Sequence, residues 1–375
     1  MFLIKIGGNK VKFMMMKKIK LFDPLIDSAE NKIISKVLKS KLWASGSGTG
    51  NVSKFETKMN QYLGSDECIA VNSGTAALNL SLSLADIKNK EVILPSLSFV
   101  STAHAVILNG GKPIFVDVDP HTLCIDPEKI IKAITKNTKL ILPVHFAGMP
   151  CDMNKINKIC KKYNLLLMED AAHATGTSYN NKKIGTDGMA VCFSFHPVKN
   201  LAMPTGGLIA LNHKQSKKFR KILEAKRWCG ITDRVASDYD VKDMGWNYYM
   251  NEFSASIGLV QLKKMDKMNK IRQKNAKKYY NEINLEQKMP MKHGCSYHFY
   301  WIMVENREEF REKMAKKGIE TGIHYKPIHH MTMYNQKRKL EITDKISKQI
   351  VSIPTHPNLK QNEVDFIVKC INDFS

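Results

Sequence analysis

Short apolar runs alternate with helical segments between residues 68 and 212, and this alternation limits the possible folds more than any other feature of the chain. Near-continuous apolar strands separated by helices indicate a parallel sheet that is buried on both faces. We therefore expect an α/β domain in which a mostly parallel sheet is flanked by helices. The runs are CIAV (68–71), EVILP (91–95), PIFVDVD (113–119), KLILPVHF (139–146), LLLMED (165–170) and GMAVCFSF (188–195).

The pattern changes after residue 260. A lysine-rich helical segment at about 261–283 is followed by strand-like runs that alternate with two further helical segments. This order indicates a smaller α+β domain over residues 261–375, after a large domain over residues 21–260. Residues 1–20 hold six lysines and no acidic residue. We interpret them as a loose N-terminal arm, or as a segment upstream of a true start at Met14–Met16.

The composition is that of a soluble globular protein, with 43% hydrophobic and 25% charged residues among 375. No run comes close to the roughly 18 apolar residues that a membrane span needs, and the N-terminal segment is a poor signal peptide. We therefore expect a cytoplasmic protein without membrane contact. The eight cysteines form no CxxC pair, so we expect reduced thiols rather than disulfides.

A protein with a formal net charge of +23 could bind a nucleic acid, an anionic membrane surface or an acidic small molecule. However, the basic residues are mostly lysines spread along helical segments, and no zinc-finger, RRM or basic-zipper pattern organises them. We therefore interpret them as solvated helix faces and expect no nucleic-acid partner.

Three of the predicted strands end in residues that can carry chemistry. The first strand leads into Ser73 and Thr75, where the N-terminus of the next helix can bind an anion. Another strand ends at Asp170, and GMAVCFSF is stopped by Pro197 two residues before Lys199. Because the carboxyl ends of parallel strands share one edge of a sheet, we expect these side chains near one another.

Each of these features also has a plainer interpretation. Ser73 or Thr75 could serve only as a helix cap, and Asp170 could cap a helix that begins at Ala171. Lys199 could simply reach water at the end of its strand. The residues alone leave these alternatives open.

Two further motifs carry less weight. In SGSGTGN (45–51) the third glycine comes too early for a dinucleotide fingerprint, and no strand precedes it. The histidine groups in HYKPIHH (324–330) and HGCSYH (293–298) lack a full set of ligands at a known metal spacing. We therefore expect no metal site.

A carboxylate, a lysine, an imidazole, hydroxyls and a helix N-terminus together match the needs of pyridoxal phosphate (PLP). PLP takes a lysine for its Schiff base, an acid that faces the ring nitrogen, and a phosphate cradle with an aromatic face. Asp170, His173, Ser194 and Lys199 supply such groups. We predict that Asp170 keeps the ring nitrogen protonated and that Lys199 shuttles a proton during an amino transfer.

Nine segments of the chain, in order, resemble the DegT/DnrJ/EryC1/StrS family of sugar aminotransferases, which are PLP-dependent enzymes of fold type I. The resemblance begins near residue 21 and runs to the end of the chain. The segments are FETKMNQYLG, NSGTAAL, PSLSFVSTAHAVILNGGKPIFVDVD, EDAAHATGTSYNNKKIG, FSFHPVKN, GGLIALN, GWNYYMNEFSASIGLVQL, GIETGIHYKPIH and IPTHPNLKQNEVDFIV.

The resemblance implies a role for each matching residue. Lys199 would form the Schiff base, Asp170 would pair with the pyridine nitrogen, and His173 would lie beside the phenolic oxygen. Phe99 would stack on the ring, and Asn247 would reach the phosphate from a neighbouring subunit of a homodimer. The residues implied to hold the phosphate are Gly74, Thr75, Ala76 and Ser194. The residues implied to lie near a sugar nucleotide are His324, Tyr325 and His329.

We therefore expect a PLP-dependent aminotransferase with pyridoxamine phosphate (PMP) as the intermediate cofactor form. It would move an amino group from an amino acid, L-glutamate, to a 4-keto sugar nucleotide in amino-sugar or surface-polysaccharide biosynthesis. The stretches PSLSFVSTAHAV, EDAAHATGT and SFHPVKN most resemble transaminases of that substrate class.

Two departures and two alternatives remain. The family often has an acidic residue before a double glycine, where this chain has PTGG (Pro204–Gly207), and Tyr249 stands where arginine is usual. Both departures leave open how the substrate or the partner subunit is held. Relatives also act on keto-cyclitols and on precursors of aromatic amines. A binding or regulatory protein that kept the fold without turnover is the alternative outside the enzyme class.

Overall fold

The structure, a computed structural model, describes residues 3–6, 9–12, 18–334 and 338–374. The start predicted at Met14–Met16 lies outside these residues. Strand β1 (Leu3–Ile6) pairs antiparallel with β2 (Asn9–Lys12).

Residues 18–20, which belong to the predicted arm, are part of the folded body. Ile19 forms a parallel bridge with Ile319, and the Leu21 N–H donates to Glu320 Oε2 at 3.0 Å. Ile19 is also buried in the hydrophobic core. This segment therefore joins the N-terminal and C-terminal parts of the chain.

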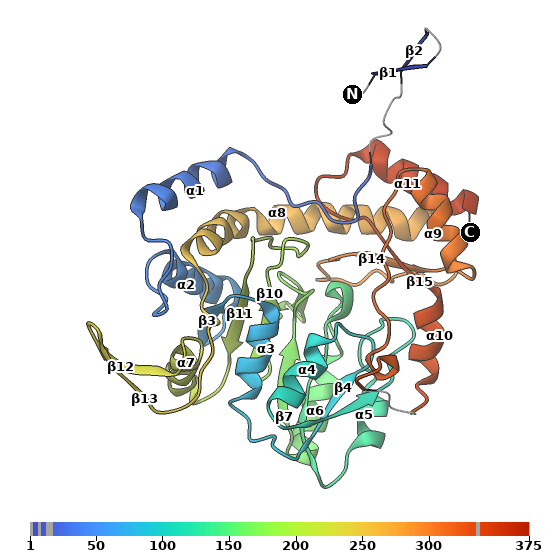
Figure 1. Cartoon of the computed structure of the whole chain (residues 1–375). Coiled ribbons are helices and arrows are strands. Elements are labelled where there is room, and N and C mark those ends of the chain that lie inside the picture. Colours follow the sequence, from blue (N-terminus) through green and yellow to red (C-terminus); the bar gives the residue numbers. More distant parts are fainter. Residues whose placement is uncertain (1–2, 7–8, 13–17, 335–337, 375) are drawn as a thin grey trace.

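A seven-stranded sheet forms the centre of the molecule (Figure 1), in the order β3-β11-β10-β7-β6-β4-β5. Neighbouring strands from β10 through β5 are parallel, whereas β11 runs antiparallel to both β10 and β3. The predicted mostly parallel sheet is confirmed. Its strands are β3 (Glu67–Val71), β4 (Glu91–Pro95), β5 (Lys112–Val116), β6 (Thr138–Ile141), β7 (Leu166–Asp170), β10 (Ala190–Ser194) and β11 (Gly207–Leu211).

Alternate side chains of each strand pack into different hydrophobic clusters. In β3, Ile69 and Val71 pack with helices α3 and α4, whereas Cys68 and Ala70 pack with α2. Because side chains alternate between the two faces of a strand, both faces of the sheet are buried. The helices that precede or follow these strands are α1 (Ser28–Ser40), α2 (Asn51–Leu63), α3 (Gly74–Leu82), α4 (Ser101–Leu108), α5 (Pro127–Ala133), α6 (Met153–Tyr163) and α7 (Ser216–Lys226).

Helix α8 (Glu252–Glu282) runs without interruption across the predicted domain boundary at residue 260. Its N-terminus is capped by Asn251, whose side chain accepts the Ser254 N–H at 2.8 Å. The helix packs on α1 and α2 in its first part and on the C-terminal elements in its last part (Figure 1). The boundary between residues 260 and 261 stays a prediction.

The C-terminal part mixes helices with a two-stranded antiparallel sheet, in which Tyr300 is paired with Ile353. Its side chains share one hydrophobic cluster with α5, α6 and the last turns of α8. Its elements are β14 (Tyr300–Met303), α9 (Arg307–Lys316), η2 (Ile328–His330), α10 (Glu341–Gln349), β15 (Ile350–Ile353) and α11 (Gln361–Phe374). The smaller elements elsewhere are η1 (Phe146–Gly148), β8 (Ser178–Tyr179), β9 (Lys182–Lys183), β12 (Ile231–Val235) and β13 (Asp238–Val241).

The eight cysteines are free thiols, and all but Cys229 are buried. In the part of the chain that the structure describes, no helix is both long enough and apolar enough to cross a membrane.

A buried charge network joins α2, β3 and α7. Glu56 accepts Arg227 Nη1 at 2.6 Å, Arg220 Nη2 at 2.7 Å and the Ala70 N–H at 2.9 Å. Glu56 and Arg227 are 2% and 1% exposed. Removing one partner of such a pair leaves the other charge buried without compensation, which is strongly destabilising.

We expect Glu56→Ala to lower the free energy of unfolding by about 3–5 kcal/mol, because Arg227 would then be buried alone. Urea denaturation followed by circular dichroism measures this change. Glu224→Ala is the matched control: it removes a half-exposed partner of the same Arg220, and a surface pair contributes about 0–1 kcal/mol. Equal losses in the two variants would contradict a structural role for the buried pair.

Candidate active site

A cavity of about 410 Å³ opens at the carboxyl ends of the central strands. Its walls come from the β3–α3 turn, the start of α4, the ends of β7 and β10, and the segment before η2. Most of the predicted site residues line it together. They are Gly74, Thr75, Phe99, Asp170, His173, Ser194, Lys199, His324 and Tyr325.

Asp170 is the last residue of β7 and is 4% exposed. Its Oδ1 accepts the Ala172 N–H at 3.0 Å, and its Oδ2 accepts Thr102 Oγ1–H at 2.8 Å. Burial raises the pKa of the Asp170 carboxyl, and the bonds from Ala172 and Thr102 together with the charge of Lys199 partly oppose this rise. A buried carboxylate of this kind favours a ligand that presents a positively charged or proton-bearing group.

Thr102 and Ser98 position this carboxylate, and neither was predicted as a site residue. Ser98 Oγ lies 2.8 Å from Thr102 Oγ1, so the hydroxyls can form a chain that ends on Asp170. Ser98 precedes α4 by three residues, and Thr102 lies in its first turn. The hydroxyl residues of SLSFVST, directly after the strand-like run EVILP, are the signal that could have identified them.

Lys199 lies in the turn between β10 and β11, where its N–H donates to His196 O at 2.8 Å. Burial lowers the pKa of the Lys199 amine from 10.5 to about 8, and the charge of Asp170 opposes the fall. A useful fraction of the amine is therefore uncharged near neutral pH, which is the form that attacks a carbonyl carbon. The structure thus favours the chemical interpretation of this lysine over simple exposure to water.

His173 is buried and neutral. Its Nδ1 accepts the Ala147 N–H at 3.3 Å, so the ring proton is assigned to Nε2, which lies 3.0 Å from Tyr325 Oη. Burial and the nearby charge of Lys199 hold the pKa of His173 well below its usual value. The residue can therefore donate a hydrogen bond without carrying a charge.

The N-terminus of α3 forms a cradle against the end of β10. Ser73 caps the helix by accepting the Ala76 N–H at 3.1 Å, and Thr75 Oγ1 lies 2.7 Å from Ser101 Oγ. A Cβ on Gly74 would stand 2.7 Å from the Cβ of Ser194, so only glycine allows this close approach. Helix N–H groups and hydroxyls together suit a phosphate group.

Several aromatic side chains line the cavity. Phe99 is 56% exposed, although it is large and apolar, and its ring lies 6.0 Å from that of Tyr325. Phe22 and His298, which were not predicted, stack with ring centroids 5.2 Å apart. Both line the cavity. Because they are far from the other site residues along the chain, no local sequence pattern could have predicted that they lie there.

Three predicted site residues do not line the cavity. Ala76 is buried, and its N–H donates to the side chain of Ser73. Asn247 is exposed, and its carbonyl accepts Asn72 Nδ2–H at 3.2 Å. His329 is buried beside Ser96 and Asp344. The roles assigned to the predicted site residues stay predictions.

The two departures in the sequence lie near this end of the sheet. Tyr249 forms an antiparallel bridge with Val71, the last residue of β3. Thr205, which follows Pro204, lines the cavity and donates its hydroxyl to Asn72 O.

A larger cavity of about 800 Å³ lies over α8 and contains neither the lysine–aspartate pair nor the helix cradle. Five of its lining residues are lysines, among them Lys270, Lys274 and Lys277. Size alone therefore does not identify the site, whereas the chemistry of the smaller cavity does.

Comparison with known proteins agrees with this geometry. SpsC of Bacillus subtilis, a spore coat polysaccharide biosynthesis protein, is 31% identical over 93% of this chain and 95% of its own. Helicobacter pylori PseC, an aminotransferase involved in the biosynthesis of pseudoaminic acid, superposes with a TM-score of 0.89 at 28% identity, over 96% of this chain and 99% of its own. Streptococcus pneumoniae Spr1654 in its PLP form gives 0.88 at 25% identity, over 95% and 98%.

The model of the DegT/DnrJ/EryC1/StrS aminotransferase family matches residues 24–372, which is almost the whole chain. The sheet, the cavity and the lysine–aspartate pair are those expected for a PLP-dependent enzyme of fold type I. The chain is therefore an aminotransferase of the DegT/DnrJ/EryC1/StrS family, with PLP as its cofactor.

Proposed function

We propose that this aminotransferase moves an amino group from L-glutamate to a keto sugar nucleotide, with the keto group at carbon 4. The observation that carries the proposal is the placement of Lys199, with its lowered pKa, in one cavity with the buried Asp170. The relatives support the substrate class, because SpsC is a polysaccharide biosynthesis protein and PseC serves the biosynthesis of pseudoaminic acid.

The residues present fit PLP. The glycine at position 74 lets the head of α3 approach the end of β10, because a Cβ there would stand 2.7 Å from the Cβ of Ser194. The N–H groups at the head of α3 and the Ser194 hydroxyl can therefore face one phosphate. Thr75 and Ser194 add hydroxyls, and Phe99 offers an exposed ring face. Asp170 would hold the pyridine nitrogen, and Lys199 would bind the aldehyde carbon. PLP, when bound, supplies an electron sink for the carbon that carries the amino group.

The side chains around the cavity then have distinct tasks. Lys199 Nζ can accept and return a proton near neutral pH, because its pKa is about 8. Asp170 Oδ1 and Oδ2 are held by Ala172 and Thr102, so the carboxylate stays aimed at its partner without reorganising. His173 Nε2–H can donate to an oxygen beside Tyr325 Oη.

The substrate side of the cavity is lined by uncharged imidazoles. Burial lowers the pKa of His324 to about 3, and its Nδ1 is bonded to Ser352 Oγ at 2.8 Å. Burial also holds the pKa of His298 well below its usual value. Neutral rings can accept or donate hydrogen bonds to sugar hydroxyls. The net charge of +23 would favour the approach of a diphosphate.

The test of the proposed function is the visible absorption spectrum of the protein with PLP. Wild type is expected to show the band of a lysine-bound cofactor, to lose it on addition of L-glutamate, and to regain it when a 4-keto sugar nucleotide is added. Lys199→Ala should form no such band, because no amine faces the aldehyde, whereas the exposed Lys182→Ala should behave as wild type.

Each outcome decides a different point. A band in Lys199→Ala equal to that of wild type would remove Lys199 from its assigned role. A wild-type band that L-glutamate leaves unchanged would overturn the donor, and one that only a keto-cyclitol or another ketone restores would overturn the sugar substrate.

The capture of PLP by the cofactor-free protein is expected to depend on pH with a midpoint near 8. Burial lowers the pKa of Lys199 from 10.5 to about 8, so the reactive neutral amine increases as the pH rises through 8. Stopped-flow absorbance at a series of pH values measures the rate. In Asp170→Asn the midpoint should fall further, because the charge that raises this pKa is lost. A midpoint near 10.5 would contradict the buried amine.

We further propose that the active unit is a homodimer in which Asn247 of one subunit completes the site of the other. Asn247 is exposed and outside its own chain's cavity, which supports this arrangement. Lys199→Ala and Asn247→Ala proteins, each of low activity, should recover about a quarter of wild-type activity when they are mixed and allowed to exchange subunits. This follows because half of the dimers then hold one intact site.

Isotope labelling of one variant, followed by native mass spectrometry of the mixture, measures subunit exchange. If mixed dimers of Lys199→Ala and Asn247→Ala form and the mixture gains no activity over its components, Asn247 acts within its own chain and the proposed arrangement is wrong.

A further inference from the structure

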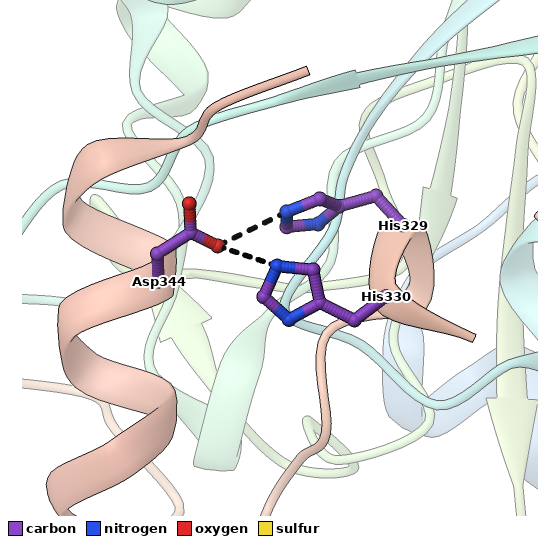
Figure 2. A group of neighbouring side chains, drawn as sticks. All are labelled: His329, His330 and Asp344. Carbon is purple, nitrogen blue, oxygen red and sulfur yellow. Dashed lines mark hydrogen bonds and ion pairs between the residues drawn. The ribbon is translucent and has the colours of Figure 1, made fainter. Parts of the chain in front are cut away.

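His329, His330 and Asp344 form a group of possible metal ligands, in which both imidazoles face the carboxylate of Asp344 (Figure 2). None of the three residues lines the cavity described above. The Nε2 atoms of both histidines lie 3.0 Å from the same oxygen, Asp344 Oδ1. All the donor atoms of the group lie within 4.8 Å of one another. The two histidines are adjacent in η2, whereas the aspartate comes from α10, so the fold alone brings them together.

The histidine side of the group is fastened to the end of β4. Ser96, the residue after that strand, accepts the Ile328 N–H on its carbonyl at 3.0 Å and the His329 N–H on its hydroxyl at 3.1 Å. These bonds fix the backbone of η2 and therefore the direction of both imidazoles.

The aspartate side is fastened to the end of the neighbouring strand, β5. Asp117 follows that strand and accepts the N–H groups of Ile342 at 2.9 Å and Thr343 at 2.7 Å in the first turn of α10. The carboxylate of Asp344 is itself held, since its Oδ2 accepts the Leu340 N–H at 3.2 Å. Because β4 and β5 are paired up to their last residues, both halves of the group rest on one rigid edge.

His329 also has the outer partner that metal-binding histidines usually have. Its Nδ1 lies 2.6 Å from Ser96 Oγ, and the residue is 1% exposed. A serine hydroxyl can accept the Nδ1 proton, which leaves Nε2 with a free electron pair directed at the point shared with His330 and Asp344.

We propose that His329, His330 and Asp344 form a binding site for a divalent metal ion, with Zn²⁺ as the best match. Two imidazole nitrogens and one carboxylate oxygen form a donor set typical of zinc with one open position. Ligand atoms around a tetrahedral zinc ion stand about 3.3 Å apart. Two separations here are 3.0 Å, and all the donor atoms lie within 4.8 Å, so a bound ion would draw the two imidazoles closer together.

The exposure of the group suits such an ion. The side chains of His330 and Asp344 are 44% and 25% exposed, so the ion can enter from solvent, while the buried His329 forms the floor. Bound metal would join α10 to the segment that begins with Tyr325, four residues before His329. Metal binding here does not depend on the proposed substrate, and the experiment below tests the metal site separately from the proposed function.

The experiment is equilibrium dialysis of the PLP-loaded protein, without a polyhistidine tag, against Zn²⁺, followed by atomic absorption. At the same concentration of free Zn²⁺, each wild-type chain should bind one more ion than a chain of His330→Ala or Asp344→Asn. Ser96→Ala should weaken binding about 10–100-fold through the loss of the outer partner of His329. His121→Ala, which removes an exposed histidine from a turn, is the matched control and should bind as wild type.

A second readout uses Co²⁺ as a probe, because its visible bands report nitrogen and oxygen ligands in tetrahedral geometry. These bands should appear in wild type and His121→Ala and be absent in His330→Ala. Metal should also raise the thermal midpoint of wild type and leave that of His330→Ala unchanged. Equal metal content in wild type and His330→Ala, or no ion bound by wild type, would show a hydrogen-bonded cluster only and overturn the proposal.

Discussion

The parallel pairing of β7 with β10 is the constraint on which the active site depends. Cys192 of β10 lies opposite Asp170, the last residue of β7, so both strands end at the same edge of the sheet. The chain that continues from β10 therefore passes this edge and carries Lys199 into the cavity that Asp170 lines. Parallel strands must be joined by long crossovers, and it is the loops at their carboxyl ends that hold the functional side chains.

Burial gives these side chains their chemistry. The same removal from water raises the pKa of Asp170 and lowers those of Lys199 and His173. Each change disfavours the charged form of the group. The attraction between Asp170 and Lys199 opposes both of their shifts, and so the lysine keeps a pKa near neutrality instead of falling further. A cofactor with charged groups of its own can then pair with Asp170 in place of Lys199.

At the ends of β4 and β5, the same edge of the sheet holds the histidine–aspartate group instead of the cavity. Ser96 and Asp117 follow these strands and hold η2 and α10 by backbone hydrogen bonds. The histidine–aspartate group is therefore positioned by the same parallel register that positions the cavity. Tyr325 lies between the two places, since it contacts His173 and precedes His329 in the same segment.

Much of the site could be predicted from the sequence, because strand ends and turns are local features. Asp170, Lys199 and the Ser73–Thr75 turn each lie where an apolar run stops, and the order of runs and helices determined that a parallel sheet would bring them together. Phe22, Thr102 and His298 were missed as cavity residues. For Phe22 and His298 the reason is that they come from the N-terminal and C-terminal parts of the chain, and no local pattern records which distant segments pack together.

The tertiary structure alone decided the rest. The sequence shows that His329 and His330 are adjacent, but it does not show which third residue could bind a metal ion with them. Asp344 joins them only because Asp117 anchors α10 beside the end of β4. The pKa of Lys199 was likewise undecided until its burial was known, since the charge state of an amine depends on the water and the carboxylate around it. Local patterns determine which groups the chain offers, and packing determines which of them meet and in which state of charge.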